Sequence, residues 1–301
     1  MTTTTAFIGL GAMGTPMATR LAGILDDLAV HDLSEQRMAA LTAHGARAGA
    51  SPADAARDAE VIVLMVVDAD QARSALFGPD GAAAAAADGA VVVLMSTVGP
   101  EPVRMLGREL DAAGLRLVDA PVSGGVARAQ AGDLLVMVGA AAADLAAVAE
   151  HLDAMASSVV HCGEAVGDGQ SVKLVNQLLC GVHIAVAGEA LAYASALGLD
   201  PAVVHETIRH GAAGSFMFDD RGSRMVERAF EEPKSALNIF VKDLGLVLEA
   251  AGSQRFPTPL TTAANQLFLM GAAQGMGYED DSGILRVYER WLAAPDDTPA
   301  S

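Results

Sequence analysis

The sequence predicts an α/β amino-terminal domain of the Rossmann type, built on a doubly wound parallel sheet, and an all-α domain after it. Over about the first 160 residues, short runs rich in branched apolar residues alternate with alanine-rich stretches, which is the pattern of a parallel sheet covered by helices. After about residue 165 the strand pattern ends and helical stretches remain. The 301 residues suffice for two domains and a large buried core.

Six apolar runs are the expected strands of the first domain. Their apolar residues are continuous rather than alternating, which favours strands that are covered on both faces. They span residues 4–10, 28–32, 60–67, 90–96, 116–123 and 133–140.

The second half is expected to consist of helices separated by glycine- and proline-containing breaks. The longest helix covers residues 168–198 and is apolar nearly all round. We predict a first domain over residues 1–165, a helical domain over 166–293 that the long helix joins to it, and a disordered tail over 294–301. The expected breaks lie at residues 198–201, 210–215, 231–233 and 255–260.

Composition and charge exclude several classes of function. The formal net charge is −18 and no basic stripe is available for phosphates, so no nucleic-acid partner is expected. The amino-terminal residues lack the basic start and the apolar run of a signal peptide. The apolar segments are too short, or too often interrupted by charge, to cross a bilayer. We therefore expect a cytoplasmic protein without a membrane partner.

The cysteines bear on the cellular compartment, and the histidines bear on metal binding. Cys162 and Cys180 are too few for a disulfide framework, which suits a reducing compartment. His151, His205 and His210 lack the spacing to cysteines or carboxylates that metal sites use. No metal is expected.

A glycine-rich segment closes the first expected strand and opens a helix. In a GxGxxG spacing, the first glycine permits a tight turn, the second lets the backbone approach a pyrophosphate, and the third lets the helix pack closely on the sheet. The phosphates then lie on the N–H groups of the helix N-terminus. Glycines also mark ordinary turns, so the motif alone is weak evidence. The candidate cofactor-binding residues are Gly9, Leu10, Gly11, Ala12, Met13 and Gly14.

Asp32 strengthens the dinucleotide interpretation. It ends the second expected strand, about 20 residues after the glycines, where a carboxylate accepts hydrogen bonds from ribose hydroxyls. The same carboxylate would repel a 2′-phosphate, so NAD is favoured over NADP, although Arg37 is near enough in sequence to reach such a phosphate. Alternatively, Asp32 is a turn carboxylate, and Ser34 caps the next helix.

Further candidates follow other strands. Met65 and Thr97 each come after an expected strand, and the carboxyl ends of strands line the ligand crevice of an open α/β sheet, so both are candidate cofactor contacts. Each is equally well explained as a turn residue. Ser123, Gly124 and Gly125 form a different candidate, because two glycines after a serine let backbone N–H groups converge on a substrate carboxylate. A plain glycine turn is the alternative there.

One polar patch interrupts the long apolar helix. Lys173, Asn176 and Gln177 lie at positions i, i+3 and i+4 on one helical face, and Gln170 lies one turn before them. Burying a charge is costly unless something compensates it, so the patch is expected to face a cavity or polar partners. A lysine that extends its charge to solvent from the start of a helix is the alternative.

Five motifs occur in an order that resembles a known family. They are GLGAMG at 9–14, STVGP at 96–100, DAPVSGG at 119–125, GQSVKLVNQ at 169–177 and FVKDL at 240–244. Together they resemble the β-hydroxyacid dehydrogenases, the group that contains 3-hydroxyisobutyrate dehydrogenase and tartronate semialdehyde reductase. The resemblance spans residues 6 to about 290 and is greatest to the L-threonate dehydrogenase branch, through segments such as SFMFDDR at 215–221.

The resemblance implies a role for each candidate residue. The first domain would bind the dinucleotide, and the helical domain would close over the substrate and form the subunit interface. Lys173 matches the catalytic lysine of the family, and Lys242 matches a second lysine near the nicotinamide end of the cofactor. Many members carry Asn-Asn after the catalytic lysine, whereas this chain has Asn176-Gln177, which leaves the role of Gln177 open. The residues that match substrate-binding positions are Ser123, Gly124, Gly125, Asn176 and Gln177.

Lysine suits the chemistry that this family performs. Oxidising an alcohol requires removal of the hydroxyl proton while a hydride leaves for the nicotinamide. A free lysine, with a pKa of about 10.4, is a poor base at neutral pH. Burial and a neighbouring cation such as Lys242 would both lower the pKa of Lys173 toward the working range.

The implied activity is NAD-dependent oxidation of a small hydroxy acid, with Lys173 as general acid and base, in a homodimer or homotetramer. A four-carbon sugar acid such as L-threonate is the favoured substrate. The activities of 3-hydroxyisobutyrate dehydrogenase and tartronate semialdehyde reductase are the alternatives, because the matched positions bind the carboxylate and hydroxyl that all these substrates share. A non-catalytic dinucleotide-binding regulator is a remote alternative, and such a protein would be expected to lack Lys173.

Overall fold

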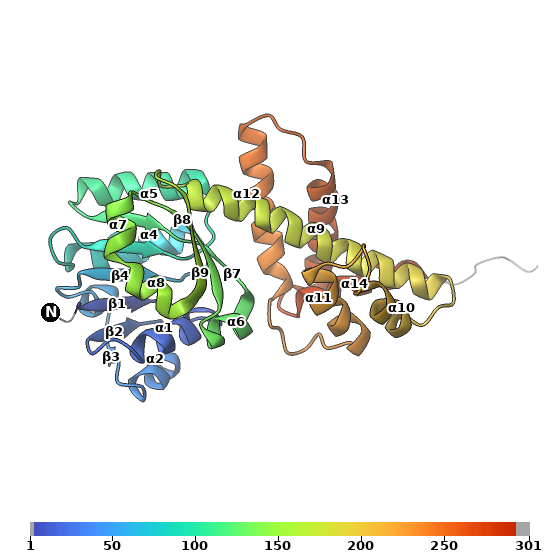
Figure 1. The fold of residues 1–301 in the computed structure, drawn as a ribbon, viewed down its shortest axis with the longest axis horizontal. Helices are drawn as coiled ribbons and strands as arrows, with labels where there is room; N and C mark the ends of the chain where they lie inside the picture. Colours follow the sequence, from blue (N-terminus) through green and yellow to red (C-terminus); the bar gives the residue numbers. More distant parts are fainter. Residues whose placement is uncertain (1–2, 293–301) are drawn as a thin grey trace, which may run out of the picture. The chain divides into compact units, whose positions relative to one another are not determined.

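The computed structural model describes residues 3–292, which lie in two compact units (Figure 1). The first unit is Met1–Lys173 and the second is Leu174–Ser301, so the division falls inside the long helix. The tail predicted at 294–301 lies outside the described residues. The separate functions expected of the two domains stay predictions.

The first unit is built on one nine-stranded sheet. Its strand order is β3-β2-β1-β4-β5-β6-β8-β7, with β9 paired to β8. The pairs from β3 to β6 are all parallel, in the strand order of a Rossmann sheet. The strands are β1 (Thr5–Ile8), β2 (Leu28–His31), β3 (Arg47–Ala48), β4 (Val61–Leu64), β5 (Val91–Leu94), β6 (Arg116–Asp119), β7 (Val122–Ser123), β8 (Leu134–Gly139) and β9 (Ala156–Gly163).

The sheet differs from the fully parallel one expected. The run predicted as a single strand at 116–123 is divided, because β6 ends before Ala120 and Pro121, and proline cannot donate to a strand ladder. Strand β8 runs antiparallel to both β6 and β7. Strands β3 and β9 were not predicted, since β3 is only two residues long and several residues of β9 are exposed and polar. The sheet is therefore mixed, with a parallel part that carries the glycine motif.

Both faces of the sheet are covered, as the continuous apolar strands predicted. Phe7 packs in one core with Met17 of α1 and Leu152 of α8, whereas Ile8 packs in a second core with Leu106 of α5. Neighbouring residues of β1 thus lie in different cores, which confirms the doubly wound arrangement. The helices are α1 (Gly14–Ala22), α2 (Glu35–Thr42), α3 (Pro52–Ala55), α4 (Ala69–Phe77), η1 (Ala82–Ala84), α5 (Pro100–Ala112), α6 (Gly125–Ala131), α7 (Ala142–Ala147) and α8 (Ala149–Met155).

The described part of the second unit is helical. Four gaps between its helices overlap the predicted breaks, and a further gap at residues 277–280 was not predicted. The long helix α9 spans Asp168–Ala196 and continues from the first unit into the second. Gly181 of α9 lies against Leu244, where an added Cβ would come within 2.6 Å of a methyl carbon, so the two helices pack closely. The other elements are α10 (Pro201–Ile208), α11 (Phe216–Glu227), α12 (Leu237–Ser253), α13 (Pro259–Gly271), η2 (Ala272–Met276), η3 (Asp281–Ile284) and α14 (Leu285–Leu292).

By length and composition alone, α9 could cross a bilayer. The core helix of a soluble protein meets the same criterion, and 44% of the most apolar window of α9 is buried within the structure. Lys173, near its start, is also buried. These features agree with the expected core helix, and the length criterion by itself is weak evidence for a membrane span.

Two ion pairs connect α11 to the segment before α14. Arg221 contacts both carboxylate oxygens of Asp281, at 2.9 and 3.0 Å, and Arg224 pairs with Asp280 at 2.5 Å. Both aspartates are fully buried, so their charges are removed from water and depend on these arginines. The segment SFMFDDR, which carries part of the family resemblance, is thereby tied to residues 280–281.

Candidate functional site

The glycine loop has the geometry expected of a phosphate-binding turn. Gly9 has a φ of +96°, and a Cβ there would overlap the carbonyl oxygen of Met65. A Cβ on Gly14 would overlap the carbonyl oxygen of Gly9, so the first turn of α1 requires glycine at that position. A Cβ on Gly11 would meet no atom within 4 Å. The fold itself thus requires Gly9 and Gly14, whereas Gly11 leaves open space on the loop, as an approaching pyrophosphate needs.

Asp32 is held beside this loop by backbone donors. Its Oδ2 accepts the N–H of Leu10 at 2.7 Å, and its Oδ1 accepts the N–H of Ser34 at 2.8 Å. Ser34 is the N-cap residue of α2, but its own side chain makes no capping hydrogen bond. Arg37 lies 3.6 Å from Oδ1. Asp32 therefore has the turn role considered above and also presents a fixed carboxylate next to the glycine loop.

The candidate cofactor residues of the first unit meet at one edge of the sheet. Strands β1, β4 and β5 are parallel and in register, with Ile8 opposite Leu64 and Leu64 opposite Leu94. The segments that follow them carry Gly9, Met65 and Thr97, so these three residues lie at the carboxyl ends of adjacent strands.

The Ser123–Gly125 segment turns sharply between β7 and α6. Gly124 has a φ of +140° and Gly125 a φ of +70°, two consecutive conformations that L side chains rarely adopt. A Cβ on Gly124 would also lie 3.0 Å from Cβ of Arg128. The backbone therefore requires glycine at both positions, and binding of a substrate carboxylate by this turn stays a prediction.

The polar patch of α9 is buried. Lys173 is 6% exposed and Gln177 is 7% exposed, and both lie on a continuous helix at the predicted i and i+4 spacing. Asn176 is half-buried, and its amide donates to Gln177 Oε1 at 2.8 Å. A buried lysine does not fit the alternative in which its charge extends to solvent.

Within the second unit, Gln177 donates a hydrogen bond to a carboxylate that the sequence did not single out. The acceptor is Asp243 of α12, which is 2% exposed and contacts Nζ of Lys242 at 2.7 Å. Asn176, Gln177, Asp243 and Lys242 therefore form a chain of direct contacts. Asp243 lies in the FVKDL motif, so its position in a motif of the family could have marked it as a candidate. The position of Lys242 near the nicotinamide end of the cofactor stays a prediction.

Within the first unit, a second buried carboxylate was missed. Asp119, at the end of β6, is fully buried, and it accepts hydrogen bonds from Gln170 and Gly167 at the start of α9. Burial is the largest influence on this group and raises its pKa to about 6, although the hydrogen bonds oppose the shift. Asp119 belongs to the DAPVSGG motif. Gln170, expected to share the polar patch, is fully buried against the residues after β5.

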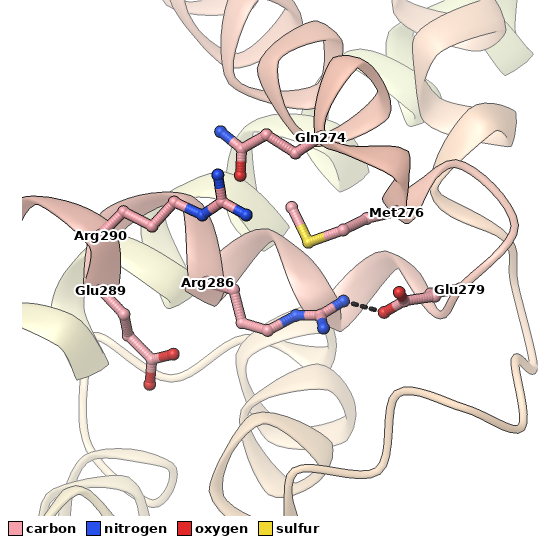
Figure 2. A pocket seen from close by; sticks show the side chains of 6 residues that line it. All are labelled: Gln274, Met276, Glu279, Arg286, Glu289 and Arg290. Atoms are coloured by element: carbon pink, nitrogen blue, oxygen red, sulfur yellow. Dashed lines mark ion pairs between the residues drawn. The ribbon is translucent and has the colours of Figure 1, made fainter.

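Two further features were sought among the described residues, a metal site and a cavity. Across residues 3–292, no three His, Cys, Asp or Glu side chains come together as a metal site would require. The second unit contains a cavity of about 310 Å³ (Figure 2). Its lining is largely charged, and Arg286 points toward Glu279, with which it is paired. None of the candidate residues lines it; the lining residues are Gln274, Met276, Glu279, Arg286, Glu289 and Arg290.

The fold and the glycine loop define a dinucleotide-binding enzyme of the Rossmann class, and comparisons with known proteins agree. Residues 4–163 match the family model described as the NAD binding domain of 6-phosphogluconate dehydrogenase. Residues 167–288 match the model described as NAD-binding of NADP-dependent 3-hydroxyisobutyrate dehydrogenase. The chain belongs to the family of 3-hydroxyisobutyrate dehydrogenase-like hydroxyacid dehydrogenases, which use NAD(P) to act on CH–OH donors.

Individual relatives support the same assignment over nearly the whole chain. L-threonate dehydrogenase of Cupriavidus necator is 41% identical over 281 residues, covering 93% of this chain and 94% of the relative. The 2-hydroxy-3-oxopropionate reductase of Escherichia coli is 33% identical, covering 94% of this chain and 96% of the relative. A crystal structure of 3-hydroxyisobutyrate dehydrogenase from Salmonella typhimurium superposes with a TM-score of 0.88 at 38% identity, covering 95% of this chain and 99% of that one.

Proposed function

We propose that the enzyme oxidises a four-carbon sugar acid such as L-threonate, with NAD as the hydride acceptor and Lys173 as the general acid and base. The observation that carries the proposal is the burial of Lys173, which is 6% exposed on an otherwise apolar helix. The amine thus lies largely out of solvent, on the helix face that it shares with Asn176 and Gln177, where it would exchange a proton with a bound substrate. Relatives that are 35–41% identical are named L-threonate dehydrogenase, which supports the choice of substrate.

The remaining candidate residues would bind either the dinucleotide or the substrate. The glycine loop and Asp32 fit a dinucleotide, which supplies a hydride acceptor when it is bound. The N–H groups of the Ser123–Gly125 turn would bind the substrate carboxylate. Lys173 would take the hydroxyl proton during oxidation and return it to the carbonyl oxygen in the reverse direction. Asn176 and Gln177 would orient the hydroxyl-bearing part of the substrate.

Substitution of Lys173 tests the proposed chemistry. In Lys173→Met, kcat should fall by about 10²–10⁴-fold, the contribution that general acid–base catalysis typically makes. The reduced dinucleotide should still bind. Lys234→Met, which replaces an exposed lysine, is the matched control and should keep wild-type kcat. Near wild-type turnover by Lys173→Met would refute the role of this amine.

The substrate is tested with a panel of three- to five-carbon hydroxy acids, by following the absorbance of the reduced dinucleotide. L-threonate should give the highest kcat/KM. A higher value with 3-hydroxyisobutyrate, or with 2-hydroxy-3-oxopropionate in the reductive direction, would replace it as the substrate while leaving the site intact.

The preference for NAD rests on Asp32. Its carboxylate lies beside the glycine loop and is 12% exposed, so it would repel a 2′-phosphate in a poorly solvated place. Arg37 offsets part of this repulsion, because its guanidinium lies 3.6 Å away. We expect kcat/KM to favour NAD over NADP, and Asp32→Ser should narrow the difference. A wild-type enzyme that prefers NADP would contradict the role given to Asp32.

We also propose that the enzyme is a homodimer or homotetramer in the cytoplasm. Val175, Leu179, Val186 and Tyr193 are 49–64% exposed, and their spacings of four, seven and seven residues place them on one stripe of α9. A second copy of the chain would cover this stripe. Neither of the two cysteines forms a disulfide, which suits a reducing compartment.

Light scattering after size-exclusion chromatography tests the oligomer. Val186→Lys should yield monomers, because it places a charge in the proposed contact. Ile24→Lys replaces an exposed apolar residue of the first unit and should leave the assembly unchanged. A monomeric wild-type enzyme at micromolar concentration would refute the proposal.

A further inference from the structure

The side-chain amide of Gln170 makes four hydrogen bonds in a place without solvent. Its Oε1 accepts the backbone N–H groups of Val98 at 2.9 Å and Gly99 at 3.0 Å. Its Nε2 donates to the carbonyl oxygen of Ser96 at 3.0 Å and to Asp119 Oδ1 at 2.9 Å. A primary amide has two N–H donors and one oxygen with two lone pairs, so every site is used. Gln170 thereby joins the start of α9 to the segment after β5.

Asp119 connects the same turn of α9 to the end of β6. Its Oδ2 accepts the N–H groups of Gly167 at 3.0 Å and of Gln170 at 2.9 Å. The first N–H groups of a helix have no intrahelical acceptor, and a carboxylate is stabilised at that end. Asp119 and Gln170 are both 0% exposed, so none of these bonds competes with water.

The network extends to a third strand through Ser96. The hydroxyl of Ser96 accepts the N–H of Val66, at the end of β4, at 2.8 Å. The ends of β4, β5 and β6 are thus tied to one turn of α9. Met65 and Thr97 lie in the tied segments, and Lys173 lies three residues after Gln170 on the same helix.

We infer that Gln170 and Asp119, together called the Gln170–Asp119 clamp, are positioning residues for hydride transfer. The clamp holds Thr97 at the cofactor edge of the sheet and fixes the turn of α9 that carries Lys173. The role of Lys173 rests on the proposed function. The role of Thr97 as a cofactor contact rests on its place at the carboxyl end of β5, so the effect of the clamp on dinucleotide binding does not depend on the substrate.

Gln170→Met tests the clamp, because methionine has a similar length but makes none of the four hydrogen bonds. The dissociation constant for NADH, measured by its fluorescence, should rise by about tenfold or more, since four buried polar groups lose a partner. Ser171→Ala is the matched control, because Ser171 lies on the same turn, is exposed, and donates its hydroxyl only to the carbonyl oxygen of Gly167, just before α9. The control should bind NADH as the wild type does.

Steady-state kinetics distinguish positioning from a loss of folded enzyme. A positioning role should raise the dinucleotide KM by about tenfold and lower kcat, while the hydroxy-acid KM stays within about threefold, because the Ser123–Gly125 turn lies outside the network. A merely structural role would lower the apparent kcat through the concentration of active enzyme and leave both KM values unchanged. That second result would overturn the inference.

Gln170→Glu provides a second variant in case Gln170→Met does not fold. Glutamate keeps an acceptor for Val98 and Gly99 but turns a carboxylate toward Asp119, with Asp168 as the other acidic group that acts on Asp119. NADH binding should be weak at about pH 8 and recover toward about pH 5.5, because a proton shared between the facing carboxyl groups restores a donor.

Wild-type affinity of Gln170→Glu for NADH throughout that pH range would refute the clamp, as would wild-type affinity of a folded Gln170→Met. If the wild-type enzyme oxidised no hydroxy acid, the proposed function would fail, and the NADH measurements would still decide on the clamp.

Discussion

The contact between Gln177 and Asp243 gives a role to the residue that departs from the usual family pattern. Asp243 is 2% exposed, so its carboxylate depends on Lys242 and on the Gln177 amide for the interactions that water would otherwise provide. Gln177→Met removes the amide and leaves one oxygen of a buried charge without that donor. A hydrogen bond to a charged group contributes about 1.5–3 kcal/mol, so the free energy of unfolding should fall by about that amount.

The same substitution should slow the reaction. The amide of Asn176 donates to Gln177 Oε1 at 2.8 Å, and it loses this acceptor when methionine replaces glutamine. A displacement of about 1 Å at a reacting centre can lower the rate by about 10²-fold, so kcat/KM should fall by about 10- to 100-fold. Gln177→Asn, the more usual residue of the family, should have a similar effect, because it withdraws the amide from Asp243 by one carbon–carbon bond, about 1.5 Å.

Urea unfolding followed by circular dichroism, together with kcat/KM for the best hydroxy acid, would measure both effects. Gln254→Met, an exposed glutamine after α12, is the control and should change stability by less than about 0.5 kcal/mol. A double-mutant cycle with Asp243→Asn should show a coupling energy of about 0.5–3 kcal/mol. Coupling near zero, with unchanged kcat/KM in Gln177→Met, would refute the role given to this contact.

Three further predictions concern stability and cofactor binding. Arg224→Met should lower the free energy of unfolding by about 3–5 kcal/mol in urea, since it leaves fully buried Asp280 without its counter-ion, whereas Arg228→Met removes an exposed pair and should cost less than about 1 kcal/mol. Gly11→Ala should fold normally and bind NADH more weakly, whereas Gly14→Ala should lower the melting temperature or abolish folding, because its Cβ overlaps the backbone; equal melting temperatures would contradict this difference. Burial raises the pKa of Asp119 from 3.8 to about 6, so the folded state binds the proton more tightly than the unfolded state does. The protonated group therefore stabilises the fold fully below about pH 4, and this stabilisation, up to about 3 kcal/mol, is lost as the pH rises through about 6. Asp119→Asn should remove this pH dependence from urea unfolding profiles.

Local sequence patterns predicted the elements whose formation depends mainly on neighbouring residues, such as apolar strands and glycine turns. The strands before the glycine loop and before Asp32 are short, continuous apolar runs, and the structure places them where expected. The backbone geometry agrees with the separate reasons given for Gly9 and Gly14, and it leaves open space at Gly11, where the approach of a pyrophosphate stays a prediction. Strand β9 was missed because its residues 157–158 are exposed serines, so it lacks the continuous apolar pattern of a covered strand.

The partners of the buried polar groups were not predictable in the same way. Gln170 and Asp119 are 51 residues apart, and Gln177 and Asp243 are 66 residues apart. Helical spacing shows that Gln170 and Gln177 share a face, but it does not show which carboxylate reaches that face. Both aspartates lie inside motifs that had already been noted, so their type and position were visible while their contacts were not.

Lys173 lies on α9 between two glutamines, each of which donates a hydrogen bond to a buried aspartate. Gln170 donates to Asp119 in the first unit, and Gln177, seven residues later, donates to Asp243 in the second. Seven residues of helix span about 10 Å, a separation at which independent stability effects usually add. The losses of unfolding free energy in Gln170→Met and Gln177→Met should therefore sum in the double variant.

Turnover should behave differently, because both contacts would hold the helix segment that carries Lys173, the amine proposed as the general acid and base. Once one contact is lost and Lys173 is displaced, losing the other contact should slow turnover only a little more. The decreases in log kcat of the two single variants should therefore add up to more than the decrease in the double variant. Stopped-flow measurement of the first turnover in the four proteins would separate this step from product release. If the decreases in log kcat were strictly additive, the two glutamines would act independently, and the idea that both hold Lys173 in place would be wrong.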